Sequence, residues 1–449
     1  MEKEAQKMNK DLTVGTPGKA LIGFTIPLFV SVIFQQLYNI ADSVIAGKYA
    51  GEDALAAIGA SYPVTMIFMA VAIGCQIGCS VVISRDFGSG DIRQTKTTIS
   101  TSLISGLALS SALTLMGVLF SRQLMSVVNT PDNIFSDGNI YLKIYTGGFV
   151  FLFIYNVATG IFNSLGDSKT PLFLLIGSSV GNIILDIVFV AVLRYGVAGA
   201  AWATFIAQGA ACVLAVIILA ARMHGMKTDS PAEKFSTSAL RDICSVALPS
   251  VLQQSFISIG NMFIQYLVNG YGSSVIAGYS AAIKLNTFAV TSFTTLGNGI
   301  SSFTAQNLGA GKMQRVKEGF RSGMTFALCV AAGFFLVYFI FGRQLLSLFM
   351  NEESSVLASD TGVNFLRIVS PFYFAVCAKL IFDGVLRGSE SMGYFMAATF
   401  TDLILRVVLA FIFTNFWGET GIWLAWPVSW MIAAFMSGTF YKKDVWVKS

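Results

Sequence analysis

The sequence predicts an all-α membrane protein whose twelve transmembrane helices form two six-helix lobes. Three observations predict this fold: a composition poor in charge, twelve long apolar segments and an internal repeat. Of the 449 residues, 55% are hydrophobic and 12% are charged, whereas about 25% of the residues in a soluble domain carry a charge. So few charges cannot cover several soluble domains. The composition therefore argues against a soluble enzyme and a nucleic-acid-binding protein.

Twelve segments are long and apolar enough to span a bilayer. A transmembrane helix needs about 20 mostly apolar residues. Each segment is expected to be helical, because lipid offers no partner to open backbone groups. The segments are 20–46, 54–84, 97–120, 140–165, 171–193, 197–221, 243–268, 274–307, 322–342, 361–386, 394–415 and 420–440.

Basic residues are spread unevenly over the loops between these segments. Membrane proteins collect Lys and Arg on the cytoplasmic side. Most of the 29 basic residues fall on one side when both termini are placed in the cytoplasm, among them Lys3, Lys7, Lys10 and Lys448. The net charge of +5 then requires no nucleic acid partner. We expect a multi-pass, monomeric protein of the cell (plasma or inner) membrane, with the lipid bilayer as its surroundings and both termini cytoplasmic.

The two halves of the chain repeat at an offset of about 222 residues. The repeat predicts an N-terminal lobe at 1–222, a cytoplasmic linker at 223–242 and a C-terminal lobe at 243–449. Because each half contains an even number of spans, a pseudo-twofold axis along the membrane normal should relate the lobes, with a cleft between them. The aligned positions include Pro27 with Pro249, Asn39 with Asn261, Tyr49 with Tyr271, and 87–91 with 308–312.

The C-terminal half contains charges that can neutralise one another. Lys379 and Asp383 are four residues apart, as are Asp402 and Arg406. Residues at this spacing share one face of a helix, so each pair can form an ion pair with a structural or gating role. Lys284 and Arg367 have no such partner in sequence. They could extend to the interface or line the cleft.

The N-terminal half contains two acids without a basic residue in their own spans, Asp42 and Asp186. An ionisable group inside a membrane is expensive and indicates a functional site. Two carboxylates surrounded by amide and hydroxyl oxygens suit Na⁺ or a shared proton and do not suit soft metals. The alternative is that both acids only form hydrogen bonds between packed helices.

Polar residues share a helix face with these acids or lie on the following span. Spacing places Gln35 and Asn39 on the face of Asp42 and Asn182 on the face of Asp186, while Thr204 and Gln208 share a face of the sixth span. The predicted ion site consists of Asp42, Asn182, Asp186 and Thr204. The predicted substrate-contacting residues are Gln35, Asn39, Gln208, Lys284, Lys379 and Asp383.

Five short stretches, in this order and spacing, resemble the multidrug and toxic compound extrusion (MATE) family. They are Q-Q-L-Y-N-I-A-D at 35–42, L-G-D-S-K-T-P at 165–171, N-I-I-L-D at 182–186, G-V-A-G-A-A-W-A-T at 196–204 and Q-N-L-G-A-G-K at 306–312. The resemblance covers nearly the whole chain. It implies that Asp42, Asn182, Asp186 and Thr204 form a cation site of the N-terminal lobe.

One departure from the family pattern places the chain nearer the prokaryotic DinF-type branch. Some members carry further acids on the seventh and tenth helices. The seventh span here reads L-P-S-V-L-Q-Q-S-F-I-S-I-G-N and contains no acid. We therefore expect one cation site, in the N-terminal lobe, and no second site in the C-terminal lobe.

The sequence predicts an antiporter that exports amphipathic, often cationic drugs or xenobiotics. The stretch 309–313 lacks the pattern of a phosphate-binding loop, so we expect no nucleotide cofactor and an H⁺ or Na⁺ gradient as the driving force. One alternative is a flippase for a lipid-linked oligosaccharide, which would need a cluster of cations in the cleft. An intramembrane enzyme is disfavoured because the lone His224 lies in a loop. A channel is a further alternative, but coupled transport fits a lobed repeat better.

Overall fold

The computed structural model describes residues 11–45, 48–49, 52–228, 230–349 and 356–447, and these residues contain helices and no strand. The predicted all-α fold is confirmed. The basic residues Lys3, Lys7, Lys10 and Lys448, used above for orientation, lie outside the described residues. Contacts along the described chain divide it into two compact units. Unit 1 holds residues 11–12, 26–255 and 309–311, and unit 2 holds residues 13–25, 256–308 and 312–447.

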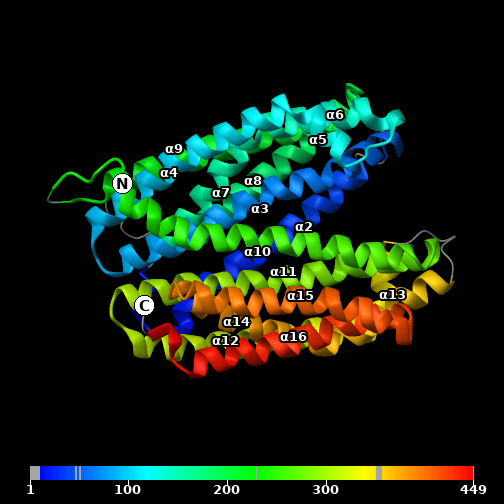
Figure 1. Ribbon diagram of the computed structural model, residues 1–449. Coiled ribbons are helices and arrows are strands. Elements are labelled where there is room, and N and C mark those ends of the chain that lie inside the picture. The colour runs from blue at the N-terminus through cyan, green and yellow to red at the C-terminus, as the bar shows by residue number, and fades with distance from the viewer. Residues whose placement is uncertain (1–10, 46–47, 50–51, 229, 350–355, 448–449) are drawn as a thin grey trace. The chain divides into compact units, whose positions relative to one another are not determined.

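The helices of unit 1 follow the predicted spans (Figure 1). Two long helices, α2 and α10, are divided between the units, and α11 has its last residue, Gly309, in unit 1. The predicted lobe boundaries stay a prediction. The elements are α2 (Pro17–Ile45), α3 (Glu52–Gly88), α4 (Ile92–Leu119), α5 (Ser121–Val127), α6 (Asp132–Gly147), α7 (Phe149–Ser164), α8 (Lys169–Asp186), the π-helix η2 (Ile187–Val192), α9 (Gly196–Gly225) and the start of α10 (Thr237–Asn269).

The helices of unit 2 repeat this order. The elements are the end of α10, α11 (Ser273–Gly309), α12 (Met313–Ser347), α13 (Val356–Val369), the 3₁₀ turn η3 (Ser370–Phe372), α14 (Tyr373–Gly388), α15 (Met392–Trp417), α16 (Glu419–Lys442) and the turn η4 (Val445–Val447).

Among the described residues, eleven of the twelve predicted spans are long and apolar enough to cross a membrane. Ten are helices that pass as single spans, and the bent pair α6 and α7 is the eleventh. The twelfth, predicted at 274–307, coincides with α11, a helix of 37 residues. α11 contains many Ser, Thr, Gly and Asn residues, which lower its mean hydropathy below that of the other spans.

Each half has a helix interrupted at a position that the sequence repeat aligns, although Val356–Gly388 in unit 2 still counts as one span. In unit 1 the break is at Gly148, where α6 and α7 meet at 45°. In unit 2 it is the turn η3, which starts at Ser370 and contains Pro371. Because proline cannot donate a backbone hydrogen bond, it ends α13 there. The matching breaks support an internal repeat that extends to backbone geometry.

Unit 1 is built around α7, which packs against α3, α4 and α9. Phe149, Phe153 and Phe162 of α7 are fully buried, and Phe149 meets Phe68 of α3 edge to face at a centroid distance of 4.9 Å. Unit 2 is built around α16, which packs against α14 and α15. Its centre holds the buried rings of Trp423 and Trp430.

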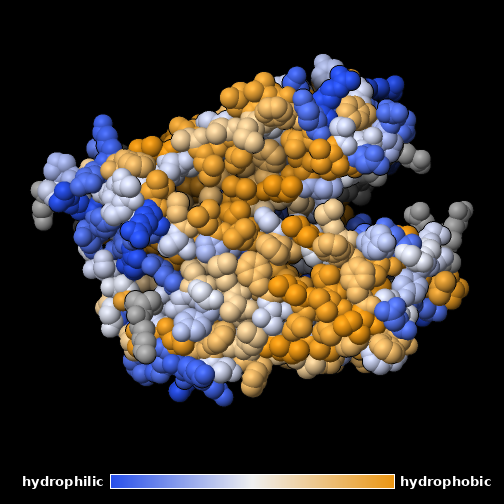
Figure 2. Space-filling model, viewed as in Figure 1, coloured by the Kyte–Doolittle hydropathy of each residue, from blue (hydrophilic) through white to orange (hydrophobic). Residues whose placement is uncertain are grey.

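The surface of the helices suits a bilayer. Figure 2 shows apolar residues over the middle of the helices on the visible face and hydrophilic residues near the helix ends. Exposed apolar side chains of this kind include Leu115, Ile217 and Phe435. Continuous apolar cover of this extent is expected where lipid, and not water, surrounds the helices.

Gly278 allows a close contact between α11 and α13, and Gly278→Ala is expected to destabilise the protein. A Cβ on Gly278 would lie 2.1 Å from the carbonyl oxygen of Ala358, so the backbones must separate, at a cost of about 1–3 kcal/mol. Gly333→Ala on α12 is the matched control, since a Cβ there meets nothing within 4 Å. Thermal unfolding in detergent measures both. Equal melting temperatures for the two variants would contradict the close contact.

Candidate functional site

Two acidic side chains meet in unit 1. Asp42 lies near the end of α2, and Asp186 is the last residue of α8. Their carboxyl groups are within hydrogen-bonding reach of one another. Asp186 is buried and Asp42 is half-buried. Ionised carboxylates are acceptors only, so two in contact need a proton or a cation between them.

Asn182 and Thr204 complete the group that the sequence predicts. The amide nitrogen of Asn182, oriented by its neighbours, donates to Asp186 Oδ2 at 2.7 Å, and its oxygen accepts from the backbone nitrogen of Thr204 at 3.1 Å. The Thr204 hydroxyl donates to the Ala200 carbonyl at 3.1 Å. The structure thus brings Asp42, Asn182, Asp186 and Thr204 together from α2, α8 and α9. Their role in ion binding stays a prediction.

One oxygen of the pair is available for a ligand. Asp186 Oδ1 is buried and has no hydrogen-bond partner among the described residues. A buried polar atom left unsatisfied costs about 1–3 kcal/mol, and more when it is charged. The described residues contain no group of three or more His, Cys, Asp or Glu side chains arranged for a metal ion. Ca²⁺ takes roughly six to eight oxygen ligands in proteins, which is more than two carboxyl groups and one amide supply.

The backbone changes geometry directly after Asp186. The π-helix η2 begins at Ile187, and π-turns often occur at functional sites. Val190 of η2 forms a buried apolar cluster with Ile45 of α2 and Ala200 of α9. Such a cluster excludes water beside the acid pair, which strengthens electrostatic interactions there.

Two tyrosines near the acids were not predicted. The Tyr38 hydroxyl lies near the side chain of Thr204 and near both acids. Tyr141 of α6 lies close to both acids and stacks on Tyr145 at a centroid distance of 6.2 Å. Tyr38 is four residues before Asp42, so helical spacing could have identified it. No spacing rule links Tyr141 to α2 or α8, because that proximity arises only when the helices pack.

Tyr38→Phe is expected to weaken ion binding without abolishing it. The variant removes a hydroxyl that lies near Thr204 and both acids and keeps the ring, so the free energy of ion binding should weaken by about 0.5–1.5 kcal/mol, which is several-fold in affinity. Tyr195→Phe is the control, because Tyr195 is exposed in the same unit. The measurement is the ion concentration that gives half-maximal transport. A value equal to that of the unmodified protein would show that the Tyr38 hydroxyl does not support the site.

The predicted substrate-contacting residues of this half are more exposed than Asn182 and Asp186. Gln35 and Asn39 are exposed, and Gln208 is half-buried. The Asn39 amide donates weakly to Gln36 Oε1 at 3.5 Å. In unit 2, Lys284 is exposed, and its ammonium lies 5.7 Å from the centre of the Phe349 ring. Contact of these residues with a substrate stays a prediction.

Four buried charges of unit 2 pair as the spacing predicts. Lys379 Nζ lies 2.9 Å from Asp383 Oδ2, and Arg406 Nη2 lies 3.0 Å from Asp402 Oδ1, so both predicted pairs are confirmed. The structure adds a contact between helices, since Lys379 Nζ is also 3.8 Å from Asp402 Oδ2. We call these four residues the unit 2 charge network. Lys379 and Asp383 are almost fully buried within unit 2, and their predicted contact with substrate is untested.

Neutral side chains surround this network. The Ser437 hydroxyl of α16 donates to Asp383 Oδ1 at 2.6 Å. The Arg406 guanidinium lies over the rings of Trp426 and Trp430, at 4.3 and 5.9 Å from their centres. The faces of aromatic rings attract cations. The network is therefore paired, hydrogen-bonded and enclosed, as expected for a structural or gating element.

Comparison with known proteins agrees with the fold and with the repeat. The protein-family model MatE matches residues 27–188 and again 249–412, so the two matches begin at the prolines that the repeat aligns. The chain is 26% identical to a probable multidrug resistance protein, YpnP, of Bacillus subtilis, with 97% of each chain covered. It is 24% identical to the multidrug export protein MepA of Staphylococcus aureus, covering 90% of this chain and 89% of MepA.

Solved structures of MATE transporters have the same fold as this chain. An outward-facing multidrug resistance MATE family transporter of the MOP superfamily aligns with a TM-score of 0.90, at 24% identity and over 99% of each chain. The two family-model matches together cover well over half of the sequence. The chain belongs to the MatE family.

Proposed function

We propose that this protein is an antiporter of the cell membrane that exports amphipathic, often cationic drugs or xenobiotics in exchange for H⁺ or Na⁺. The observation that carries the ion coupling is the contact between the Asp42 and Asp186 carboxyl groups. The drug-export part is supported by relatives described as multidrug resistance and multidrug export proteins. We assign no catalytic residues and no cofactor, and we expect a monomer with both termini cytoplasmic.

The acid pair holds one positive charge more readily than none. With both carboxyl groups ionised, two like charges would lie side by side and away from water, which is costly. A proton or a Na⁺ between them removes the repulsion, and Asp186 Oδ1 offers a further acceptor for it. Loading and release of the ion therefore change the charge on α2 and α8 together.

An ion gradient supplies enough free energy for drug export. One elementary charge moving across 100 mV gains about 2.3 kcal/mol, so one ion at about 150 mV supports a concentration ratio of a few hundredfold. In the proposed cycle, the outward-facing state loads the ion at Asp42 and Asp186 and releases the substrate. Ion release to the cytoplasm restores the site for the next substrate.

A flippase for a lipid-linked oligosaccharide fits the structure less well. Such a protein needs cations free to bind a pyrophosphate. The predicted spans that hold Asp42 and Asp186, 20–46 and 171–193, contain no Lys or Arg, and in unit 2 Lys379 and Arg406 are each paired with an acid. The two relatives named above are likewise described as a probable multidrug resistance protein and a multidrug export protein.

The test is transport by the purified protein in proteoliposomes. A fluorescent organic cation is loaded, and a pH gradient and a Na⁺ gradient are imposed separately. We expect one of the two gradients, inward-directed, to drive export against the concentration of the cation. An export rate of the cation that does not change with either gradient would contradict the proposed function.

A further inference from the structure

The residues that precede α2 are held by two basic side chains of unit 2. Lys312 Nζ donates to the Thr13 carbonyl at 2.9 Å and lies 3.1 Å from the Thr13 hydroxyl. Arg315 donates to the Gly15 carbonyl at 2.6 Å and to the Val14 carbonyl at 3.1 Å. We call residues 13–15 with Lys312 and Arg315 the N-terminal anchor.

The anchor is itself held in place by a buried residue. Arg315 Nε donates to Asn307 Oδ1 at 3.0 Å, and the Asn307 amide donates to the Phe303 carbonyl at 2.8 Å. Asn307 is fully buried, and its own carbonyl accepts from the Lys312 backbone nitrogen at 2.8 Å. A guanidinium fixed in this way presents its remaining donors in one direction. The anchor is therefore an ordered arrangement, unlike a pair of mobile surface side chains.

The first turns of α2 continue this attachment through close packing. Leu21, Phe24 and Thr25 are almost fully buried. A Cβ on Gly299 of α11 would lie 2.7 Å from Thr25 Oγ1, and one on Gly323 of α12 would lie 2.9 Å from Leu21 Cδ2. Small residues thus let α2 approach unit 2 closely.

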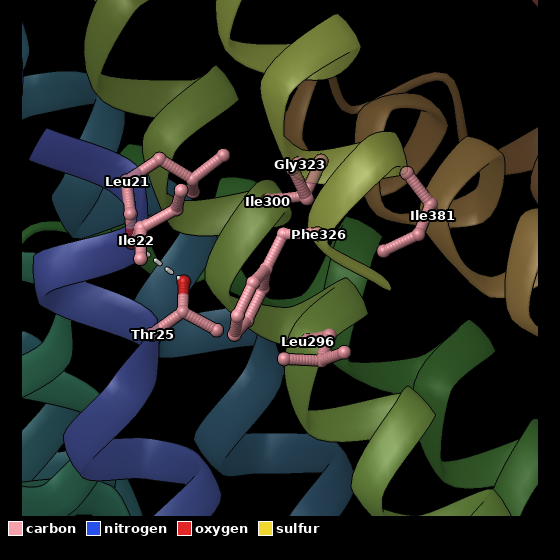
Figure 3. Close-up of a pocket in the computed structure, with 8 residues that line it drawn as sticks. All are labelled: Leu21, Ile22, Thr25, Leu296, Ile300, Gly323, Phe326 and Ile381. Atoms are coloured by element: carbon pink, nitrogen blue, oxygen red, sulfur yellow. Dashed lines mark hydrogen bonds between the residues drawn. The ribbon is translucent and has the colours of Figure 1, made fainter. Parts of the chain in front are cut away.

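A small apolar pocket lies beside this packing. Figure 3 shows side chains from α2, α11, α12 and α14 around it, with the Thr25 hydroxyl turned back to the Leu21 carbonyl. No polar group of the lining is left for a ligand, because the Thr25 hydroxyl is already used within its own helix. The pocket is therefore packing space beside α2, and we assign it no ligand. Its lining residues are Leu21, Ile22, Thr25, Leu296, Ile300, Gly323, Phe326 and Ile381.

The other repeat attaches its first helix in the same manner with different residues. The backbone nitrogens of Glu233 and Ser236, just before α10, donate to the hydroxyls of Thr97 and Thr101 of α4 at 3.1 and 3.0 Å. Residues 26–255, which include the start of α10, belong to unit 1, and residues 13–25 belong to unit 2. Each repeat therefore begins its first helix in the unit formed mainly by the other repeat.

The first helices of the two repeats, α2 and α10, differ in the residues near their C-terminal ends. α2 continues as one helix from Pro17 to Ile45 and bears Tyr38 and Asp42 of the candidate ion site. α10 has Ile264 where the repeat aligns Asp42. Of the two, only α2 thus joins an attachment in unit 2 to the acid pair of unit 1.

We propose that Lys312 and Arg315 are positioning residues of the transport cycle, which hold the start of α2 to unit 2 so that a change of ion at Asp42 acts on unit 2 through this helix. The inference rests on the proposed function, because it assumes that Asp42 loads an ion. It assigns the two basic residues a role in turnover and none in ion binding. They contact backbone carbonyls of residues 13–15, which precede α2, whereas Asp42 lies near the other end of that helix.

The test is a comparison of turnover with ion loading in Lys312→Ala/Arg315→Ala. Turnover is ion-driven export of a fluorescent cation by the full-length protein in proteoliposomes. Ion loading is the protection of Asp42 and Asp186 from a hydrophobic carbodiimide as pH and Na⁺ vary, read by peptide mass spectrometry. We expect turnover to fall by about tenfold, with unchanged loading curves and an unchanged melting temperature. Arg321→Ala is the matched control, since it removes an exposed basic side chain from the same helix.

Each result decides the proposal. Unchanged turnover in the double variant would overturn it, and so would a loss of ion loading or of melting temperature in proportion to turnover. If the double variant does not fold, Arg315→Gln is read by the same criteria, because the carbonyls of Val14 and Gly15 lie at exposed residues that water can reach. If the unmodified protein shows no ion-driven export, the proposed function fails. If the unmodified protein shows ion-driven export and the anchor variants export equally well, the proposed role of the anchor fails and the proposed function stands.

Discussion

Asp42→Asn and Asp186→Asn are each expected to reduce ion-driven export to the level of vesicles without the protein. In the proposed cycle, the carboxyl groups of both residues hold one positive charge between them, and the two groups interact in the structure. An amide neither takes up a proton at physiological pH nor offers the charge that binds Na⁺. The variants should insert and fold, since Asn is close to Asp in size. Export of a fluorescent cation from everted vesicles measures the effect.

The control for these variants is Asp132→Asn. Asp132 is an exposed acid at the start of α6 in the same unit, and its variant should export normally. Normal export by both Asp42→Asn and Asp186→Asn, at equal protein levels, would remove the acid pair from the mechanism.

Lys379→Met is expected to be the most destabilising substitution in unit 2. Lys379 contacts Asp383 and Asp402, and its loss leaves the buried Asp383 without its ion-pair partner, although the Ser437 hydroxyl still donates to it. Breaking a buried ion pair by removing one partner costs about 3–5 kcal/mol. Unfolding of the purified protein by heat or by dodecyl sulfate, followed by tryptophan fluorescence, measures the change in stability.

A second substitution separates charge balance from packing at the same place. Lys379→Met/Asp383→Leu removes both members of the pair, and Asp402 keeps Arg406. Removing both partners of a buried pair is often nearly neutral, so most of the lost stability should return. Lys284→Met on α11, which changes an exposed Lys, should stay within about 0.5 kcal/mol. A double variant as unstable as Lys379→Met alone would show that packing, and not charge, explains the effect.

The fold could be predicted from the sequence almost completely, because its determinants are local. Long apolar segments predict the helices, whereas the orientation inferred from charge in the loops stays a prediction. The spacing of Lys379 with Asp383 and of Asp402 with Arg406 predicts two ion pairs, and the structure shows both. The break at Gly148 was not predicted, since it lies inside one uninterrupted apolar segment.

The candidate site could be predicted only in part. Asp42, Asn182, Asp186 and Thr204 carry polar groups where apolar ones are expected, which makes them visible in a sequence. Tyr141 approaches the acids only because α6 packs beside them. The contact of Lys379 with Asp402 likewise depends on how α14 lies against α15. Contacts between helices without a polar anomaly or a fixed spacing require the structure.

The most direct test of the account measures ion and substrate flux in the same proteoliposomes. Export of a fluorescent cation and counterflow of the coupling ion are recorded together, for the unmodified protein and for Asp42→Asn/Asp186→Asn. We predict that the unmodified protein moves ion inward as substrate leaves, at a fixed ratio, and that the double variant moves neither. Ion-driven export that persists in the double variant would contradict the claim that the Asp42 and Asp186 pair couples the ion to transport.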